Sequence, residues 1–418
     1  MSTDQKNDAE ILHKLFDQLP DEKFSKPQLG ETHKPNIDVG LAMKTSLEQP
    51  TLYPPLAESV FAGDSVAIVL QSNLPHAKIV LESLLEQLMQ INVEPADIVV
   101  VISAKTAQQL GIDATIYEQA KENLAEGMQP GTFVVEFGFH GINFQVHDAE
   151  NEAAHAYLAA NAEGEPIHVN RVLVDADVVI PIGSPTAGDM NQQTDCIYPD
   201  FSNETSRARL AKGQSSFVSR WQEIELANDS LGSFFTIQVV FGPGETIQNI
   251  FAGSRPEVTK IARDTTNELW AFDWHQGEVD VVVATIESKS GDQGWDDFAN
   301  ALITASHVST EQGPIVIWSE ISARSDRNIH KALMSQFEEG ISKKLTKTMQ
   351  HVAAIVNERP VYLRSRLKRD AVEELGLGFI ETAEEIVRIS DSYQTALLIR
   401  DAHKCQLRTA TVTETEAE

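Results

Sequence analysis

The fold is decided by the stretch SVAIVLQSNLPHAKIVLESLLEQLMQINVEPADIVVVIS, residues 65–103. It begins with an apolar run that is continuous up to Leu70, as in a strand buried on both faces. After His76 the apolar side chains recur at helical spacing, at Ile79, Leu81, Leu84, Leu85 and Leu88. A second continuous apolar run lies between Asp97 and Ser103. Apolar strands that alternate with helices predict a parallel sheet covered on both faces.

The same alternation continues along the chain. RVLVDADVVIPIG (171–183) predicts a further strand, EAAHAYLAA (152–160) a helix, and residues 234–253 a β-hairpin around a Gly-Pro-Gly-Glu turn. Further strands are predicted at 279–286, 313–321 and 360–365, and helices at 255–269, 295–306, 332–357 and from 383. We therefore expect an α/β fold class with two α/β domains, mostly parallel sheets and an inter-domain cleft.

The change in texture near residues 213–232 suggests the domain boundary. We expect a polar N-terminal arm at 1–45, a first α/β domain at 46–220 and a second at 221–405. A disordered acidic tail is expected at 406–418. The arm either packs on the body of the molecule, which we favour, or reaches a partner.

Composition excludes several classes of function. Acidic residues outnumber Lys and Arg by 62 to 33, a net charge of -29 that repels nucleic acid and anionic membranes. Only two cysteines occur, Cys196 and Cys405, which fits a reducing compartment. The N-terminus lacks the pattern of a signal peptide, and no apolar stretch approaches the roughly 20 residues of a membrane span. We expect a cytoplasmic protein.

The sequence contains no strong motif for phosphate binding, metal binding or catalysis. No glycine-rich phosphate loop follows a strand, and the 12 histidines match no metal-ligand spacing. His147 at a strand end is the most site-like, but a lone histidine there is more often structural. Asp175 and Asp177 lie two apart on the expected strand, where a solvated strand entry is favoured over acid–base work. Cys196 reads as a structural thiol.

One basic run interrupts the acidic chain. It comprises Arg359, Arg364, Arg366, Lys368 and Arg369. Such a run could receive an anion or a partner's acidic surface. Intramolecular balance against acidic helices is the favoured interpretation.

Read in order, the segments resemble one family. The phrases GEPIHVNRVLVDADVVIPIG (164–183) and VVFGPGETIQNIFAG (239–253) carry the resemblance, which covers residues 50–400. The chain is similar to the nickel-pincer-dependent lactate racemase family, a two-domain α/β fold that handles 2-hydroxy acids. The resemblance implies specific chemistry in the loops after the strands.

The first two loops of this chain depart from that family's pattern. The family's first loop carries an arginine that binds the substrate carboxylate, whereas Leu74 occupies this place here, between Gln71 and Pro75. Leucine cannot pair with a carboxylate. The family's second loop carries an acid–base histidine, whereas Lys105 lies in the corresponding region here.

The third loop, residues 182–200, departs furthest. In the family it carries a catalytic histidine, a lysine that holds the cofactor covalently, and then a nickel-binding histidine. Here Ser184 and Pro185 follow the strand, and no lysine lies between Arg171 and Lys212. No histidine lies between residues 168 and 275, and the family's lysine on a C-terminal helix is missing at 297–300.

We therefore expect a lactate-racemase-like protein without nickel-pincer racemase activity and without a cofactor. It would bind a small polar or hydroxy-acid ligand in the inter-domain cleft. The expected ligand-binding residues are Gln71, Asn73, Lys105, Ser184, Asn191 and Gln192.

Two alternatives stay open. The first is an enzyme on the same scaffold, either a divergent active racemase or epimerase or one that acts on a hydroxy acid or sugar acid. Its residues would be Asp189, Asp195, Lys105 or His147, and such carboxylates could hold Mg²⁺. The second is a protein-interaction role for the basic run or the N-terminal arm.

Overall fold

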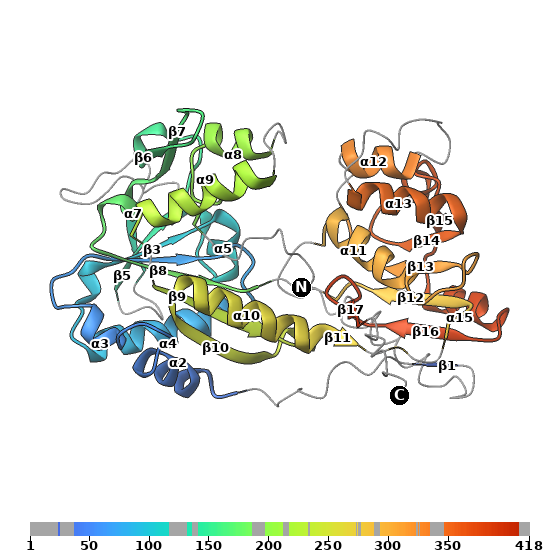
Figure 1. The fold of residues 1–418 in the computed structure, drawn as a ribbon, viewed down its shortest axis with the longest axis horizontal. Helices are drawn as coiled ribbons and strands as arrows, with labels where there is room; N and C mark the ends of the chain where they lie inside the picture. The colour runs from blue at the N-terminus through green and yellow to red at the C-terminus, as the bar shows by residue number, and fades with distance from the viewer. Residues whose placement is uncertain are drawn as a thin grey trace, which may run out of the picture. The chain divides into compact units, whose positions relative to one another are not determined.

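The chain folds as two compact units. A computed structural model describes residues 24–25, 37–116, 132–135, 141–185, 197–211, 217–232, 235–272, 274, 277–287, 293–322, 325, 327–334 and 347–408. The N-terminal unit holds residues 34–266, and the C-terminal unit holds residues 267–418 together with residues 1–33. Each unit is an α/β structure built around its own sheet (Figure 1), so the predicted fold class is confirmed.

The N-terminal unit is built on a seven-stranded sheet with the order β10-β9-β8-β2-β3-β5-β4. The strands are β2 (Val66–Leu70), β3 (Ile98–Ile102), β4 (Thr132–Val135), β5 (Ile142–Val146), β8 (Val178–Gly183), β9 (Phe235–Phe241) and β10 (Ile247–Ser254). All neighbours pair in parallel except β4 with β5 and β10 with β9. The predicted strand–helix–strand unit is confirmed as β2, α4 (Ala77–Gln90) and β3.

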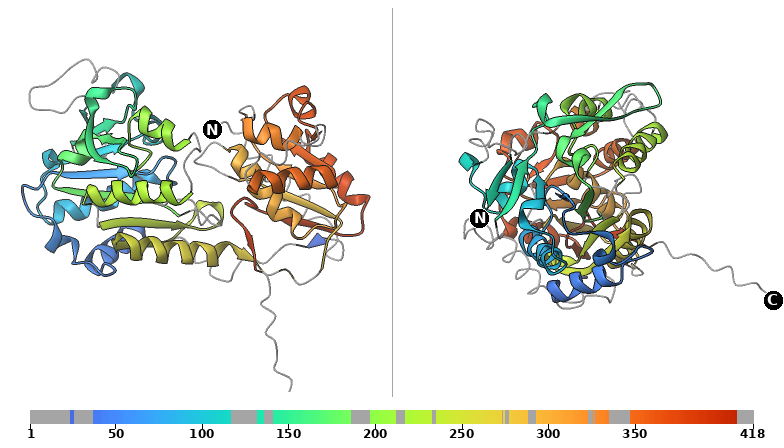
Figure 2. Two further views of the ribbon diagram at one scale, coloured as in Figure 1. Left: turned by 45° about the horizontal axis from the view of Figure 1, so that its top comes forward. Right: turned by 90° about the vertical axis from the view of Figure 1, so that its left-hand side faces the viewer.

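Alternating side chains bury both faces of this sheet. On β2, Ile68 and Leu70 join a core that includes α2 (Val39–Glu48) and α4, whereas Ala67 and Val69 join one that includes α7 (Arg171–Asp175). Other helices in the described part of this unit include α3 (Leu56–Ser59), α5 (Ala104–Gln109), α8 (Glu204–Ala211) and α9 (Phe217–Ser230). Figures 1 and 2 show α2 and α4 on one side of the sheet and α7, α8 and α9 on the other.

Two predicted elements are wrong. Residues 155–160 form strand β6 (His155–Ala160), which pairs antiparallel with β7 (Pro166–Asn170). Pairing with a neighbouring strand overrides the helix propensity of this alanine-rich segment. The expected strand at 171–183 is divided, because Asn170 caps the N–H of Val172 and starts α7 before β8 begins.

The C-terminal unit has a parallel six-stranded sheet with the order β1-β16-β12-β13-β14-β15. Its strands are β1 (Phe24–Ser25), β12 (Val281–Thr285), β13 (Ile315–Trp318), β14 (Val361–Arg364), β15 (Gly378–Phe379) and β16 (Ala396–Ile399). Its helices are α11 (Trp295–Ser306), α12 (Arg327–Met334), α13 (Lys347–Glu358), α14 (Arg369–Glu373) and α15 (Ala383–Asp391). A two-stranded sheet joins β11 (Ala271–Phe272) to β17 (Gln406–Leu407).

The two units meet in sequence at residues 266 and 267, within α10 (Arg255–Trp270). The sequence places this boundary at 220. The difference arises because the hairpin β9–β10, which is confirmed, continues the sheet of the N-terminal unit through β8. Residues 24–25 of the expected arm pair with β16 of the C-terminal unit.

Gly253 on β10 is a position that only glycine fits. Its φ is +136°, and a Cβ there would lie 2.3 Å from the carbonyl oxygen of Thr51. Thr51 crosses at this point, because its N–H donates to Ala252 O (2.8 Å) and its oxygen accepts from Ser254 N–H (2.8 Å).

We expect Gly253→Ala to lower the free energy of unfolding of the N-terminal unit by at least about 2 kcal/mol, since the backbone is strained and the contact must break. Thermal unfolding followed by circular dichroism measures this change. Gly40→Ala on α2 is the matched control, because its Cβ would meet nothing closer than 3.5 Å. Equal midpoints for the two variants would contradict this account.

Candidate functional site at the carboxyl edge of the N-terminal sheet

The chain order of the seven-stranded sheet reverses between β2 and β8. The connection from β2 leads to β3 on one side, whereas β8 lies on the other side of β2 and leads to β9. In open α/β sheets, ligands bind outside the carboxyl ends of the two strands at such a reversal. The loops after Leu70 and after Gly183 meet at this place, and both contain predicted site residues.

Gln71 and Ser184 join the two loops. The Oε1 of Gln71 accepts a hydrogen bond from the N–H of Ser184 (2.6 Å), and the Gln71 N–H donates to Ile182 O (3.0 Å). The first bond orients the Gln71 amide so that its Nε2 donors remain available, since no described residue accepts from them. Two of the predicted residues are thus brought together.

Asn73 lies in the same loop with a left-handed backbone, φ 64°. Asparagine tolerates this conformation better than most residues. Its Oδ1 is buried and, among the described residues, accepts no hydrogen bond. A buried amide oxygen without a donor is uncommon in folded proteins and is often found where a ligand or water binds.

The loop continues through Leu74 and His76. The Leu74 side chain is 2% exposed and belongs to the main core of the unit, so it does not face a ligand. His76 begins α4 with φ 53°, and its Nε2 lies 3.0 Å from the carbonyl oxygen of Glu245 in the β9–β10 turn. The loop after β2 therefore contacts both the β8 loop and this turn. His76 and Glu245 were not predicted, because no motif marks either residue.

Lys105 follows the next strand, β3. Ser103 caps α5 by accepting from Thr106 N–H (3.2 Å), which places half-buried Lys105 in the first turn of that helix. Asn191 and Gln192 lie outside the described residues, as do Asp189, Asp195 and Cys196.

His147, the most site-like histidine, is part of a buried polar cluster. Its Nε2 donates to the carbonyl oxygen of Ser202 (3.1 Å), and its Nδ1 accepts from the Asn170 amide (3.3 Å). Asn170 also donates to Gln145 Oε1 (2.8 Å). Burial, together with the nearby His155 ring, lowers the pKa of His147 to about 4. This neutral, fully bonded imidazole has a structural role.

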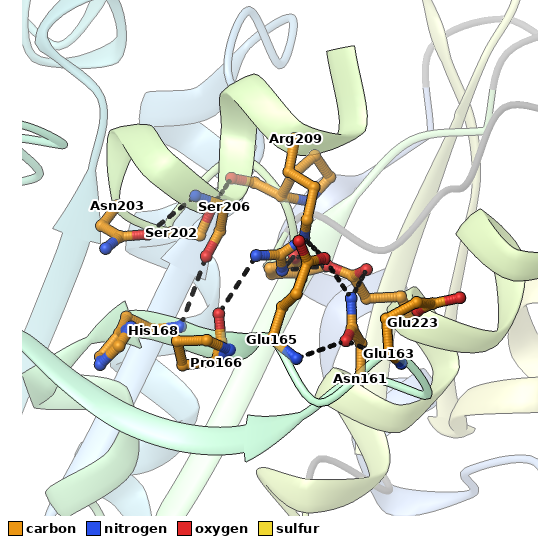
Figure 3. A network of polar contacts seen from close by, with 12 residues as sticks. Asn161, Glu163, Glu165, Pro166, His168, Ser202, Asn203, Ser206, Arg209 and Glu223 are labelled. Carbon is orange, nitrogen blue, oxygen red and sulfur yellow. Dashed lines mark hydrogen bonds and ion pairs between the residues drawn. The ribbon is translucent and has the colours of Figure 1, made fainter. Parts of the chain in front are cut away.

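A second buried network was not predicted. Glu223 on α9 accepts hydrogen bonds from the hydroxyl of Tyr198, from Arg209 on α8 and from Asn161 (3.0 Å). Arg209 also contacts Glu165 (3.4 Å) in the β6–β7 turn, as Figure 3 shows. Burial alone would raise the pKa of the Glu223 carboxyl, but these donors outweigh it and hold the pKa below its usual value. These contacts hold Tyr198, near the end of the third loop (residues 182–200), to Glu223 on α9 and Arg209 on α8.

The paired carboxylates Asp175 and Asp177 do not share a strand face. Asp175 ends α7, and Asp177 lies between α7 and β8. The hydroxyl and N–H of Ser65 donate to Asp177 (2.7 and 2.9 Å), and these bonds lower the pKa of its carboxyl. Asp177 therefore ties the starts of β2 and β8 together, which accords with the favoured structural interpretation.

The arginines of the basic run bind partners within the chain. Arg364 pairs with Glu320 and lies 4.8 Å from the centre of the Trp318 ring, and Arg366 pairs with the same carboxylate (2.7 Å). Arg369 lies over the Phe379 ring at 4.5 Å, and Arg359 donates to Thr310 O (3.0 Å). These contacts accord with intramolecular charge balance.

The described residues at the β2–β8 edge do not fit a nickel group. They offer amide and hydroxyl oxygens, whereas nickel in proteins favours imidazole and other nitrogen or sulfur ligands. The one imidazole in the β2 loop, His76, is engaged by Glu245. Across the described part of the chain, no three His, Cys, Asp or Glu side chains are grouped to hold a metal ion.

Comparisons with known proteins agree with this architecture. Residues 15–186 match the family described as the lactate racemase N-terminal domain. The lactate racemase apoprotein from Thermoanaerobacterium thermosaccharolyticum has a TM-score of 0.65 at 14% identity, covering 94% of this chain and 97% of that one. A protein from Thermotoga maritima has a TM-score of 0.57 at 14% identity, covering 91% and 100%. No curated protein sequence matches the chain.

The two sheets define a two-unit α/β protein that shares its fold with the lactate racemase apoprotein. Residues 15–186 match the lactate racemase N-terminal domain family, and the chain as a whole is similar in fold to the lactate racemase apoprotein. Within the described residues, no helix has the length and apolar character needed to cross a membrane. The inter-domain cleft stays a prediction.

Proposed function

We propose that this lactate racemase-like protein binds a small polar ligand at the β2–β8 edge and does not carry out the nickel-pincer racemase reaction. The observation that carries the proposal is the Gln71–Ser184 bond at the sheet's reversal point, together with the buried Asn73 Oδ1 of the same loop. Gln71 supplies amide donors and Asn73 an acceptor. A hydroxyl group of a small molecule can accept from the Gln71 amide and donate to Asn73 Oδ1, whereas a carboxylate can accept from Gln71 only.

The absence of racemase chemistry rests on the residues in the loops. Removing a hydride from a 2-hydroxy acid needs a hydride acceptor, two bases and a carboxylate clamp. Residues 172–211 contain no lysine to hold the acceptor, and Leu74, in place of the clamp, is in the core. An enzyme that uses Lys105 or His147 is the alternative. The burial of His147 and its two hydrogen bonds speak against that residue as a base.

Ligand binding is tested by thermal shift with a panel of hydroxy acids, sugar acids and divalent metal ions. We expect at least one hydroxy or sugar acid to raise the unfolding midpoint, and Gln71→Leu to abolish the rise because it removes both the donors and the bond to Ser184. Gln108→Leu, on the exposed side of α5, is the control that keeps the rise. No stabilisation by any compound, or an unchanged rise in Gln71→Leu, would contradict the proposed site.

A separate experiment tests whether the protein catalyses racemisation. Protein incubated with D- or L-lactate and a source of the cofactor should show no interconversion and no bound nickel by elemental analysis. Stoichiometric nickel would overturn this part of the proposal while leaving the ligand site to be judged on the thermal-shift result.

A further inference from the structure

The C-terminal unit has a reversal point of its own, between β12 and β16. The connections from β12 lead in order to β13, β14 and β15, whereas β16 pairs with the opposite side of β12. The rule that places ligands at the carboxyl ends of such strands applies here as well. The residues that leave these ends are Glu287 after β12 and Arg400 and Asp401 after β16.

Glu287 and Arg400 form an ion pair next to the carboxyl ends of β12 and β16. The Glu287 carboxylate accepts from Arg400 Nε (3.2 Å) and Nη2 (2.7 Å), and from the buried Thr285 hydroxyl (2.6 Å). Two parallel guanidinium bonds give this pair a defined orientation. Its opposite charges cancel, so it does not select a ligand by net charge.

Asp401 combines burial with an unusual backbone conformation, and the contacts within the fold do not account for either. It is 2% exposed and has a left-handed backbone, φ 48°, a conformation that is uncommon for residues other than glycine. Its Oδ1 accepts from Glu287 N–H (3.3 Å) and lies 3.8 Å from Lys404 Nζ. No residue in the described part of the chain donates to its Oδ2. Buried carboxylates are normally bonded at both oxygens, and strained residues cluster at functional sites.

His403, two residues on, presents a second unused polar group. Its Nδ1 is buried and has no hydrogen-bond partner among the described residues. Burial, with the nearby Lys404, holds the pKa of His403 well below its usual value, so the ring is neutral and offers one donor and one acceptor.

The turn that carries both residues is rigid. Ala402 N–H donates to Thr285 O (2.9 Å), Lys404 N–H to Asp401 O (2.8 Å), and Cys405 Sγ to Arg400 O (3.3 Å). Lys404 lies 5.2 Å from the centre of the Trp270 ring. The unused groups are therefore held in place before any ligand arrives, which lowers the entropy cost of binding.

We propose that the turn Arg400–Cys405 at the β12–β16 reversal is a second binding site, for a neutral hydroxyl-bearing small molecule such as a polyol or sugar. A hydroxyl group can donate to Asp401 Oδ2 and accept from the His403 ring, whereas an ammonium group only donates and a carboxylate only accepts. The pairs Glu287–Arg400 and Asp401–Lys404 leave the site without net charge. This site is independent of the one proposed in the N-terminal unit.

The test is isothermal titration of the full chain with glycerol, glucose and myo-inositol, with lactate and inorganic phosphate as charged comparators. We expect at least one neutral polyol to bind, and both Asp401→Leu and His403→Phe to weaken that binding by roughly tenfold or more, because each removes a hydrogen bond to the ligand. Gln108→Leu, on the exposed side of α5 in the other unit, should leave polyol affinity unchanged.

If Asp401→Leu fails to fold, the proposal can still be tested, because the chemical reactivity of His403 provides a second measurement. Carbethoxylation of His403, followed by peptide mass spectrometry, should fall when the polyol is present, whereas modification of exposed His351 should not. Binding of the charged comparators alone, absence of polyol binding, or polyol binding that survives in His403→Phe would each overturn the proposal.

Discussion

Arg209→Met is expected to destabilise the N-terminal unit by about 3 kcal/mol. The substitution leaves the Glu223 carboxylate, which is 7% exposed, without its cationic partner. Breaking a buried pair from one side is costly because the remaining charge stays desolvated. Tyr198 and Asn161 still donate to Glu223, which keeps the loss near the lower end of the range for such pairs.

Two variants separate this cause from general damage. Arg209→Met combined with Glu223→Leu removes both charges, and we expect it to recover at least half of the lost stability. Lys260→Met removes a cation from the exposed pair Lys260–Asp264 on α10 and should cost about 0.5 kcal/mol or less. Urea unfolding followed by circular dichroism measures all three. A double variant that is less stable than Arg209→Met would refute the role given to the buried pair.

The second large effect is a loss of stability on acidification that arises from His147. Its pKa is about 4 in the folded chain, compared with about 6.5 for an unperturbed histidine. Between these values the unfolded chain binds a proton that the folded chain does not. Stability therefore falls as the pH drops from about 6.5 to about 4, by about 3 kcal/mol from this residue, and stays level below that window.

His147→Gln isolates this contribution, because the glutamine amide can still donate to Ser202 O but does not titrate. The difference in unfolding free energy between the wild type and this variant should change across that pH window. His168→Gln, at a half-buried histidine on β7, is the comparison variant. A pH-independent difference for His147→Gln would show that the imidazole titrates normally.

The sheets could be predicted because their strands carry an unmistakable physical signal. β2 and β3 are buried on both faces, so each reads as an unbroken apolar run, and the helix between them has a clear 3.6-residue period. β6 could not be predicted in the same way. Its alanine-rich segment has no apolar alternation, and only pairing with β7 makes it a strand.

The domain boundary illustrates a related limit. The hairpin β9–β10 is recognisable from its turn, but its sequence does not indicate which sheet it extends. Its place is decided by pairing between β8 and β9, at Ile182 with Ile237 and Gly183 with Gln238. Such contacts join residues far apart in sequence, which local patterns do not encode.

From the sequence, candidate site residues could be identified only where they follow a predicted strand. Polar residues after apolar strands identified Gln71, Asn73 and Ser184, because parallel strands bring their carboxyl ends to one edge. The Tyr198–Glu223–Arg209 network was missed because its members come from three separate segments. Asp401 was missed because nothing in an Arg-Asp-Ala-His run marks a residue as buried or left-handed.

The pairing of β1 with β16 has a consequence for synthesis of the chain on the ribosome. Phe24 and Ser25 are synthesised long before their partners Ala396 and Leu397. The N-terminal unit can fold during translation, whereas the C-terminal sheet cannot be completed until β16 has been made. Until then the first strand has no partner, and a chain released early leaves it without one. A nascent chain truncated before β16 would therefore retain a complete N-terminal unit beside an incomplete and aggregation-prone remainder.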